Sequence, residues 1–160
     1  MSDMITQLAS RLTSLQWMMA TAESCTGGLM AARCTDLAGS SRWFERGFVT
    51  YSNAAKTELL GVNPDLISAE GAVSEAVARA MALGAVYRTP AKVSIAVTGI
   101  AGPDGGSADK PLGTVWFAWC IDGQVSAQIQ RLDGDRSSIR AAAVHWGLQG
   151  LLQRLPGPLG

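Results

Sequence analysis

The chain has 160 residues, of which 48% are apolar and 16% are charged, with thirteen Lys and Arg balancing thirteen Asp and Glu. This length and composition predict one globular domain, residues 1–160, with a loose tail at about 156–160, and they argue against a disordered chain. A net charge of zero leaves no basic surplus for phosphate backbones, so we expect no nucleic acid partner.

Three cysteines and a single histidine argue against a metal protein. Structural zinc needs several ligands at close spacing, whereas Cys25, Cys34 and Cys120 lie far apart and form no CxxC pair. Such cysteines are typical of reduced thiols in the cytosol. The N-terminus is acidic without a signal peptide after it, and no apolar run reaches the ~18 residues of a membrane span. We therefore expect a cytoplasmic protein without a membrane partner.

Hydrophobic periodicity and capping residues predict alternating helices and strands. In chain order these are a helix over 3–15, a strand over 17–22, a helix over 29–38, a strand over 44–51, a helix over 53–61 with Asn53 as its cap, a helix capped by Ser74, strands over 92–97, 115–121 and 124–130, and a helix capped by Asp135. The order predicts the α/β class, as a single layered α/β/α domain with a mixed sheet and helices on both faces. Ligands in such folds bind beyond the carboxyl ends of the strands.

The first segment suited to chemistry follows the first predicted strand. Ser24, Cys25 and Thr26 precede two glycines, Gly27 and Gly28, which open a helix. Unpaired N–H groups at a helix start can bind an anion or an oxyanion, and Ser24 and Cys25 are both candidate nucleophiles. The alternative is a helix cap, since Ser and Thr before a helix usually satisfy backbone donors, and Cys25 alone is typical of a small buried apolar residue.

A glycine-rich segment, TGIAGPDGGS over residues 98–107, follows the strand that ends at Val97. Glycines let the backbone approach a ligand closely and can form an anion-binding nest. The segment lacks the Gly-Lys-Ser/Thr of a Walker A loop and the spacing of a dinucleotide GxGxxG. The alternative is a flexible surface loop, against which Pro103 and Pro111 indicate a shaped one.

Two arginines begin the last predicted helix. Arg136 lies in its first turn, where the helix dipole disfavours a cation, and Arg140 follows one turn later. A bound phosphate would reverse that penalty. The alternative is a surface ion pair of Arg136 with Asp133 or Asp135.

Lys56 begins a short helix behind a strand end. A lysine that lies near a serine and is partly desolvated can lose its proton and act as a base. The histidine, His145, belongs to an apolar helix, so a Ser–Lys pair is the natural alternative to Ser-His-Asp chemistry. The other interpretation, a solvated surface lysine, is the one that we favour for Lys92 and Lys110.

Six motifs in order resemble the CinA C-terminal domain family. They are TAESCTGG (21–28), GFVTYSNAAK (47–56), GAVSE (71–75), TGIAGPDGG (98–106), KPLGTV (110–115) and GDR (134–136), and the resemblance covers about residues 5–155. Standalone members are nicotinamide-nucleotide amidases. The resemblance thus implies hydrolysis of the carboxamide of nicotinamide mononucleotide (NMN) to nicotinate mononucleotide and ammonia, feeding NAD salvage, without a cofactor or a metal.

The resemblance also implies roles for single residues. It implies that Ser24 is the nucleophile, that Lys56 is the base, and that Tyr51 is a third member that orients the pair or relays a proton. We expect Glu23 to face the cationic pyridinium ring. The positions that we expect to bind substrate, through an oxyanion hole, an anion site or a strand end, are Thr26, Gly27, Gly28, Thr98, Gly99, Gly102, Gly105, Gly106, Arg136 and Arg140.

Two other functions stay open. One is a non-catalytic nucleotide-binding module related to competence and damage-inducible proteins, which needs the glycine loops but no Ser–Lys pair. The other is a hydrolase that uses the Cys25 thiol. The joint presence of Ser24, Tyr51 and Lys56 favours the amidase. Family members tend to be oligomeric, and aromatic residues such as Trp43 can line subunit interfaces, so we expect a homodimer or a larger homo-oligomer.

Overall fold

A mixed five-stranded sheet organises the chain, with the strand order β2-β1-β3-β4-β5. The strands are β1 (Met19–Glu23), β2 (Phe44–Val49), β3 (Val93–Gly99), β4 (Thr114–Ile121) and β5 (Gln124–Arg131). β1 pairs in parallel with β2 and β3, whereas β4 pairs antiparallel with β3 and β5. The computed structural model describes residues 2–157.

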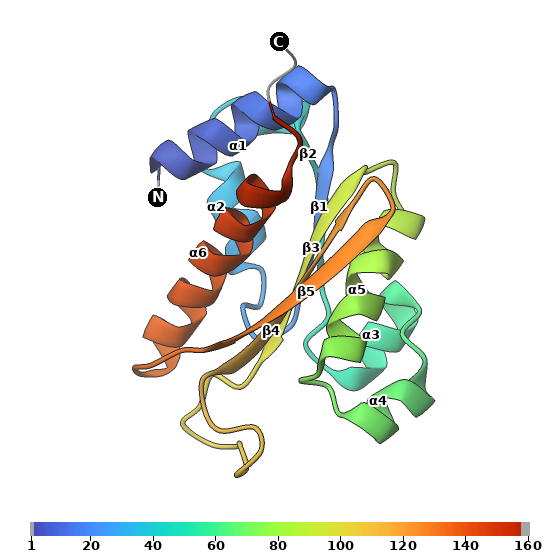
Figure 1. Ribbon diagram of the computed structural model, residues 1–160, viewed down its shortest axis with the longest axis vertical. Helices are drawn as coiled ribbons and strands as arrows, with labels where there is room; N and C mark the ends of the chain where they lie inside the picture. The colour runs from blue at the N-terminus through green and yellow to red at the C-terminus, as the bar shows by residue number, and fades with distance from the viewer. Residues whose placement is uncertain (1, 158–160) are drawn as a thin grey trace.

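Helices cover both faces of the sheet, so the predicted α/β/α layering is confirmed (Figure 1). One face carries α1 (Ser2–Leu15), α2 (Leu29–Thr35) and α6 (Arg136–Arg154). The other carries α3 (Asn53–Leu60), α4 (Pro64–Glu70) and α5 (Glu75–Tyr87). Each face has its own apolar core, because successive side chains of a strand point to opposite sides of the sheet.

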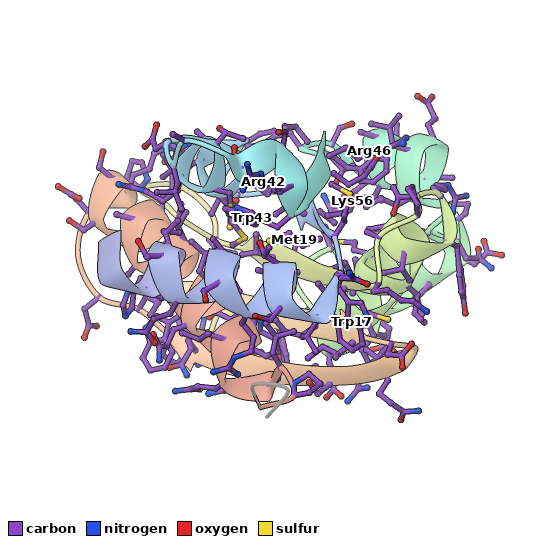
Figure 2. The ribbon with its side chains drawn as sticks, turned by 90° about the horizontal axis from the view of Figure 1, so that it is seen from above. Trp17, Met19, Arg42, Trp43, Arg46 and Lys56 are labelled. Carbon is purple, nitrogen blue, oxygen red and sulfur yellow. The ribbon has the colours of Figure 1, made fainter. Side chains whose placement is uncertain are left out.

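β1 is buried along its whole length and β3 along all but its last residue, as expected for parallel strands covered on both faces. In β3, Val93, Ile95 and Val97 face α6, while Ala96 joins the core beneath α5. Viewed from above, Met19 lies beside Trp43 in the middle of the molecule, and the Met19 N–H donates to the Trp43 carbonyl over 2.8 Å (Figure 2). Large side chains of the sheet fill the core beneath α6, whereas small ones such as Ala96 let α5 pack close to the sheet.

Helix ends follow the capping residues in most places. The side chains of Ser74 and Asp135 each accept a backbone N–H in the first turn, and Gly61 ends α3 in the left-handed conformation, as predicted. The cap expected at Asn53 is wrong by one residue. Ser52 caps α3 by accepting the Ala55 N–H over 3.0 Å, so the Asn53 side chain takes no part in the cap.

Two stretches of the predicted order are wrong. Helix α4 was not expected, although the Asn63 side chain caps it by accepting the Asp65 N–H and Pro64 occupies its first turn, which is a recognisable start signal. Helix α2 ends at Thr35 rather than at Ala38. The chain then forms a short 3-10 turn over Ser40–Arg42 before β2.

The start of the C-terminal tail contacts the first helix. The Arg11 guanidinium donates to the Pro156 carbonyl over 3.0 Å, which holds the start of the expected tail against α1. Residues 158–160 of that tail lie outside the described residues. Within residues 2–157, no helix combines the length and the apolar character needed to cross a membrane.

Helix α6 contacts the sheet so closely that a methyl group at Gly150 would overlap the Trp119 ring. We expect Gly150→Ala to destabilise the fold by about 1–3 kcal/mol, because the rigid indole has no room to move. At Gly147 the added methyl would meet the flexible end of Met30, so Gly147→Ala should be close to neutral, with the helix propensity gain of about 1 kcal/mol offsetting the contact. Urea unfolding of both variants is the measurement, and equal losses would contradict the close approach.

Candidate functional site

The site lies where the parallel strands end. Ser24 directly follows β1, and its N–H donates to the Val97 carbonyl of β3 over 3.0 Å. On the other side, the Thr50 N–H donates to the Glu23 carbonyl over 2.7 Å. Ser24 thus sits between the ends of β2 and β3. The connection from β1 to β2 runs through α2 on one face of the sheet, and the connection from β2 to β3 runs through α5 on the other face. Such a switch point is the usual ligand site of an open α/β sheet.

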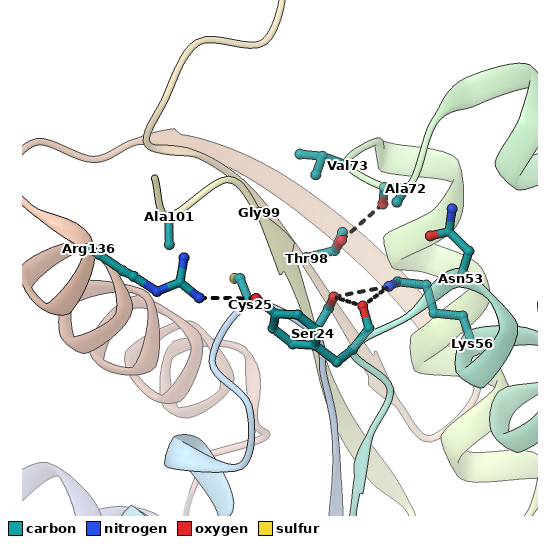
Figure 3. A pocket seen from close by; sticks show the side chains of 11 residues that line it. Ser24, Cys25, Asn53, Lys56, Ala72, Val73, Thr98, Gly99, Ala101 and Arg136 are labelled. Atoms are coloured by element: carbon teal, nitrogen blue, oxygen red, sulfur yellow. Dashed lines mark hydrogen bonds between the residues drawn. The ribbon is translucent and has the colours of Figure 1, made fainter. Parts of the chain in front are cut away.

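The Lys56 amine lies against the Ser24 hydroxyl, with Nζ and Oγ 3.0 Å apart (Figure 3). The lysine side chain is only 1% exposed. Its amine also donates to the backbone carbonyls of Thr50 and Tyr51, at 3.1 and 3.3 Å. All three contacts are to uncharged oxygens. Within residues 2–157, no carboxylate is hydrogen-bonded to Lys56 to balance the charge of an ammonium group.

Burial lowers the pKa of Lys56 from the ordinary value of 10.5. Removal from water penalises the charged form, and the position of Lys56 in the first turns of α3 adds the unfavourable helix dipole. Both effects favour the neutral amine, which can accept a proton. A solvated surface lysine, the alternative interpretation, is wrong for this residue.

Cys25 is buried next to Ser24, and burial raises the pKa of its thiol to about 12. Thiolate is the nucleophilic form of cysteine, so this environment holds Cys25 unreactive near neutral pH. The adjacent Ser24 hydroxyl, in contact with the amine, has the partner that the thiol lacks.

The segment after Ser24 forms a tight turn. The Gly27 N–H donates to the Ser24 carbonyl over 3.1 Å, and Gly27 itself has a left-handed φ of 57°. Of the N–H groups expected to bind an oxyanion, that of Gly27 thus closes this turn. Within residues 2–157, the N–H groups of Cys25 and Thr26 donate to no other residue. Cys25 lines the pocket, whereas Thr26 is fully buried behind it.

Glu23 does not face the pocket, contrary to the expectation that it meets a pyridinium ring. Its carboxylate is fully buried and accepts the Thr26 hydroxyl at 2.5 Å and the Met30 and Ala31 N–H groups at 2.8 and 3.0 Å. These N–H groups belong to the first turn of α2, which has no cap from Gly28. Glu23 therefore caps α2 from within the sheet.

Arg136 enters from α6 on the side of the pocket opposite Lys56 (Figure 3). Its guanidinium donates to the Gly102 carbonyl over 2.7 Å and to the Tyr51 hydroxyl over 3.0 Å, rather than forming the surface ion pair considered above. The Tyr51 side chain is 60% exposed. Tyr51 meets the Ser24–Lys56 pair through its backbone carbonyl, so its phenol is not the part that touches the pair.

An open cavity of about 230 Å³ joins these groups. It is lined by Ser24, Cys25, Tyr51, Asn53, Lys56, Ala72, Val73, Thr98, Gly99, Ala101 and Arg136. Asn53 was not expected in the site, because its position in the sequence suggested a helix cap. Ala72 and Val73 belong to a motif of the family resemblance, and the Thr98 hydroxyl holds their loop by donating to the Ala72 carbonyl over 2.9 Å.

Other positions expected to bind substrate do not line this cavity. They are Thr26, Gly27, Gly28, Gly102, Gly105, Gly106 and Arg140. A role for them in substrate binding stays a prediction. Within the described part of the chain, no three His, Cys, Asp or Glu side chains lie close enough together to hold a metal ion.

Comparisons with known proteins place the chain among enzymes and competence proteins. The sequence model of the CinA C-terminal domain matches residues 1–155. Proteins named nicotinamide-nucleotide amidohydrolase PncC are 51% identical in Enterobacter agglomerans, over 94% of this chain and 93% of theirs, and 49% identical in Pseudomonas putida, over 94% and 97%. The crystal structure of competence damage-inducible protein A from Klebsiella pneumoniae superposes with a TM-score of 0.93 at 37% identity, covering 96% of this chain and 95% of that one.

We expect Glu23→Gln to destabilise the protein by about 1–3 kcal/mol, because the amide turns a donor toward an N–H that needs an acceptor. Denaturant unfolding measures the loss. Glu45→Gln is the control, since Glu45 pairs with Arg46 at the surface and such pairs contribute little. Equal stability of the two variants would contradict the capping role of Glu23.

Proposed function

The chain belongs to the CinA C-terminal domain family, and we propose on that basis that it is a nicotinamide-nucleotide amidohydrolase, which converts NMN and water to nicotinate mononucleotide and ammonia. The two PncC relatives support the substrate, since they match the chain almost end to end at about half of its residues. One observation carries the mechanism: a buried lysine amine lies 3.0 Å from a serine hydroxyl at the carboxyl ends of the parallel strands.

The carbonyls around Lys56 orient its proton-accepting lone pair. A neutral amine has two N–H bonds and one lone pair. The carbonyls of Thr50 and Tyr51 can only accept hydrogen bonds, so they take the two N–H bonds. The lone pair is then left toward the third neighbour, the Ser24 hydroxyl. Lys56 in this form is a general base aimed at the nucleophile.

The reaction proceeds in two halves. The Ser24 oxygen bonds to the carboxamide carbon while its proton passes to Lys56, and the free N–H groups of Cys25 and Thr26 bind the resulting oxyanion. The Lys56 ammonium then gives this proton to the amide nitrogen, and the C–N bond breaks. Ammonia departs, and the acyl group remains on Ser24 as an ester. Water, deprotonated by Lys56, hydrolyses that ester and restores the serine.

Arg136 supplies the positive charge for the nucleotide phosphate. It lies across the pocket from Lys56, and its side chain begins at the N-terminus of α6, whose dipole also favours an anion. The glycine-rich loop lies beside it through the Gly102 carbonyl. In this proposal, the carboxamide binds at Ser24 and the phosphate binds at the N-terminus of α6. A role in NAD salvage, a cytoplasmic location and a homodimer or larger assembly remain parts of the proposal.

Ammonia release from NMN tests the nucleophile. We expect Ser24→Ala to lose at least about 10³-fold in kcat, because a covalent route has no replacement for the hydroxyl. Cys25→Ala is the neighbouring control and should retain activity within a few-fold. Loss of activity in Cys25→Ala with full activity in Ser24→Ala, both folded, would reverse the assignment.

The pH dependence of kcat/KM tests the base. Only neutral Lys56 accepts the serine proton, so activity should rise with pH through the pKa of this amine. Because burial lowers that pKa, the midpoint of the rise should fall below 10.5. Steady-state kinetics over a pH range in which the protein stays folded gives the midpoint. A rise centred at or above 10.5, or a flat profile, would contradict a desolvated lysine base.

A further inference from the structure

We propose that Arg140 is a positioning residue, which fixes the turn carrying the oxyanion-binding N–H groups; this inference rests on the proposed function. Its guanidinium donates through Nε to the Cys25 carbonyl over 3.1 Å and through Nη2 to the Thr26 carbonyl over 3.0 Å. The side chain therefore holds two successive peptide groups directly after the nucleophile. It does not line the cavity.

Peptide planarity transmits this contact to the N–H groups. In a trans peptide, the carbonyl and the N–H of the next residue point in opposite directions. The bond from Arg140 to the Cys25 carbonyl thus sets the direction of the Thr26 N–H, which is free. The bond to the Thr26 carbonyl supports the next peptide, which the Leu29 N–H and the bond from the Gly27 N–H to Ser24 also hold.

Three other hydrogen bonds restrain the turn. Glu23 accepts the Thr26 hydroxyl, the Gly27 N–H donates to the Ser24 carbonyl, and the Leu29 N–H donates to the Thr26 carbonyl over 3.0 Å. Within residues 2–157, none of them reaches the Cys25 carbonyl, which only Arg140 holds. Carbonyl oxygens bonded to a guanidinium cannot rotate without losing charge-assisted hydrogen bonds. Arg140 therefore keeps the free N–H groups directed where an oxyanion forms, before the substrate arrives.

Two arginines one turn apart on α6 then have different tasks. Arg136 lines the cavity and contacts Tyr51 and Gly102, whereas Arg140 contacts the backbone behind the nucleophile. The helix is anchored farther along, where the Trp119 indole donates to the Gly147 carbonyl over 2.8 Å. A rigid helix thus joins the phosphate side of the site to the oxyanion side.

The test uses the full chain with Arg140→Ala and Arg140→Lys, in two reactions. The first is ammonia release from NMN and from nicotinamide riboside, which lacks the phosphate. The second is labelling of Ser24 by an alkyl fluorophosphonate, followed by mass spectrometry. In that step the Ser24 oxygen bonds to phosphorus, the P–F bond breaks, fluoride leaves and the hydroxyl proton passes to Lys56. It needs the oxyanion N–H groups but no nucleotide.

We expect Arg140→Ala to slow both kcat and labelling by about 10- to 100-fold, with the KM for NMN unchanged, because a misdirected donor weakens only the transition state. Arg140→Lys should lose less, since an ammonium can reach one of the carbonyls. Arg154→Met is the matched control on the same helix. It loses contacts to Ser126, Gln128 and the Trp119 ring, and should lower the melting temperature without changing either rate.

Three results would overturn the inference. Variants that label and turn over like the wild type would show that the turn holds itself, and Arg140→Lys gives this answer if Arg140→Ala does not fold. A raised KM for NMN, with no loss on nicotinamide riboside, would make Arg140 a phosphate ligand instead. If the wild type neither reacts with the fluorophosphonate nor releases ammonia, the serine mechanism and the inference are both wrong. If Ser24 is labelled but NMN is not hydrolysed, only the proposed substrate is wrong, and the labelling rates of the Arg140 variants still test the inference.

Discussion

The contact between the Lys56 amine and the Ser24 hydroxyl is the constraint on which the rest of the site depends. Burying a lysine is costly while it stays charged, and the cost falls when the amine is neutral and hydrogen-bonded. Here three uncharged oxygens surround it, two of them main-chain carbonyls fixed by the end of β2. A structural lysine would gain more from a carboxylate partner, so this environment suits a base rather than a stabilising charge.

The sheet topology explains how two residues 32 positions apart meet. Ser24 follows β1, and Lys56 is the fourth residue of α3, the helix that follows the neighbouring strand β2. The turn after Ser24 is held from inside the sheet by the buried Glu23 carboxylate and from α6 by the Arg140 guanidinium. In the proposed mechanism, these two polar groups shape the backbone that stabilises charge during the reaction. Flexibility of that backbone would weaken catalysis without weakening substrate binding.

The sequence predicted the layered fold and most helix starts, because caps, glycines and periodicity are local signals. The Ser–Lys pair was expected from the resemblance to the family. It could not show which way a side chain turns. Glu23 was assigned to the substrate but caps α2, and Tyr51 meets the pair through its carbonyl. Arg140 was assigned to phosphate on its place in a helix, whereas its partners are main-chain oxygens 115 and 114 positions away. Such contacts depend on tertiary packing, and no local pattern encodes them.

The most direct test of the central claim is to trap the ester. Wild-type protein is mixed with excess NMN, quenched with acid during turnover and digested, and the peptides are weighed by mass spectrometry. The account predicts that the peptide containing Ser24 gains the mass of a nicotinate mononucleotide ester, and that fragmentation places it on Ser24. Turnover without any adduct, or an adduct on Cys25, would contradict a serine nucleophile activated by Lys56.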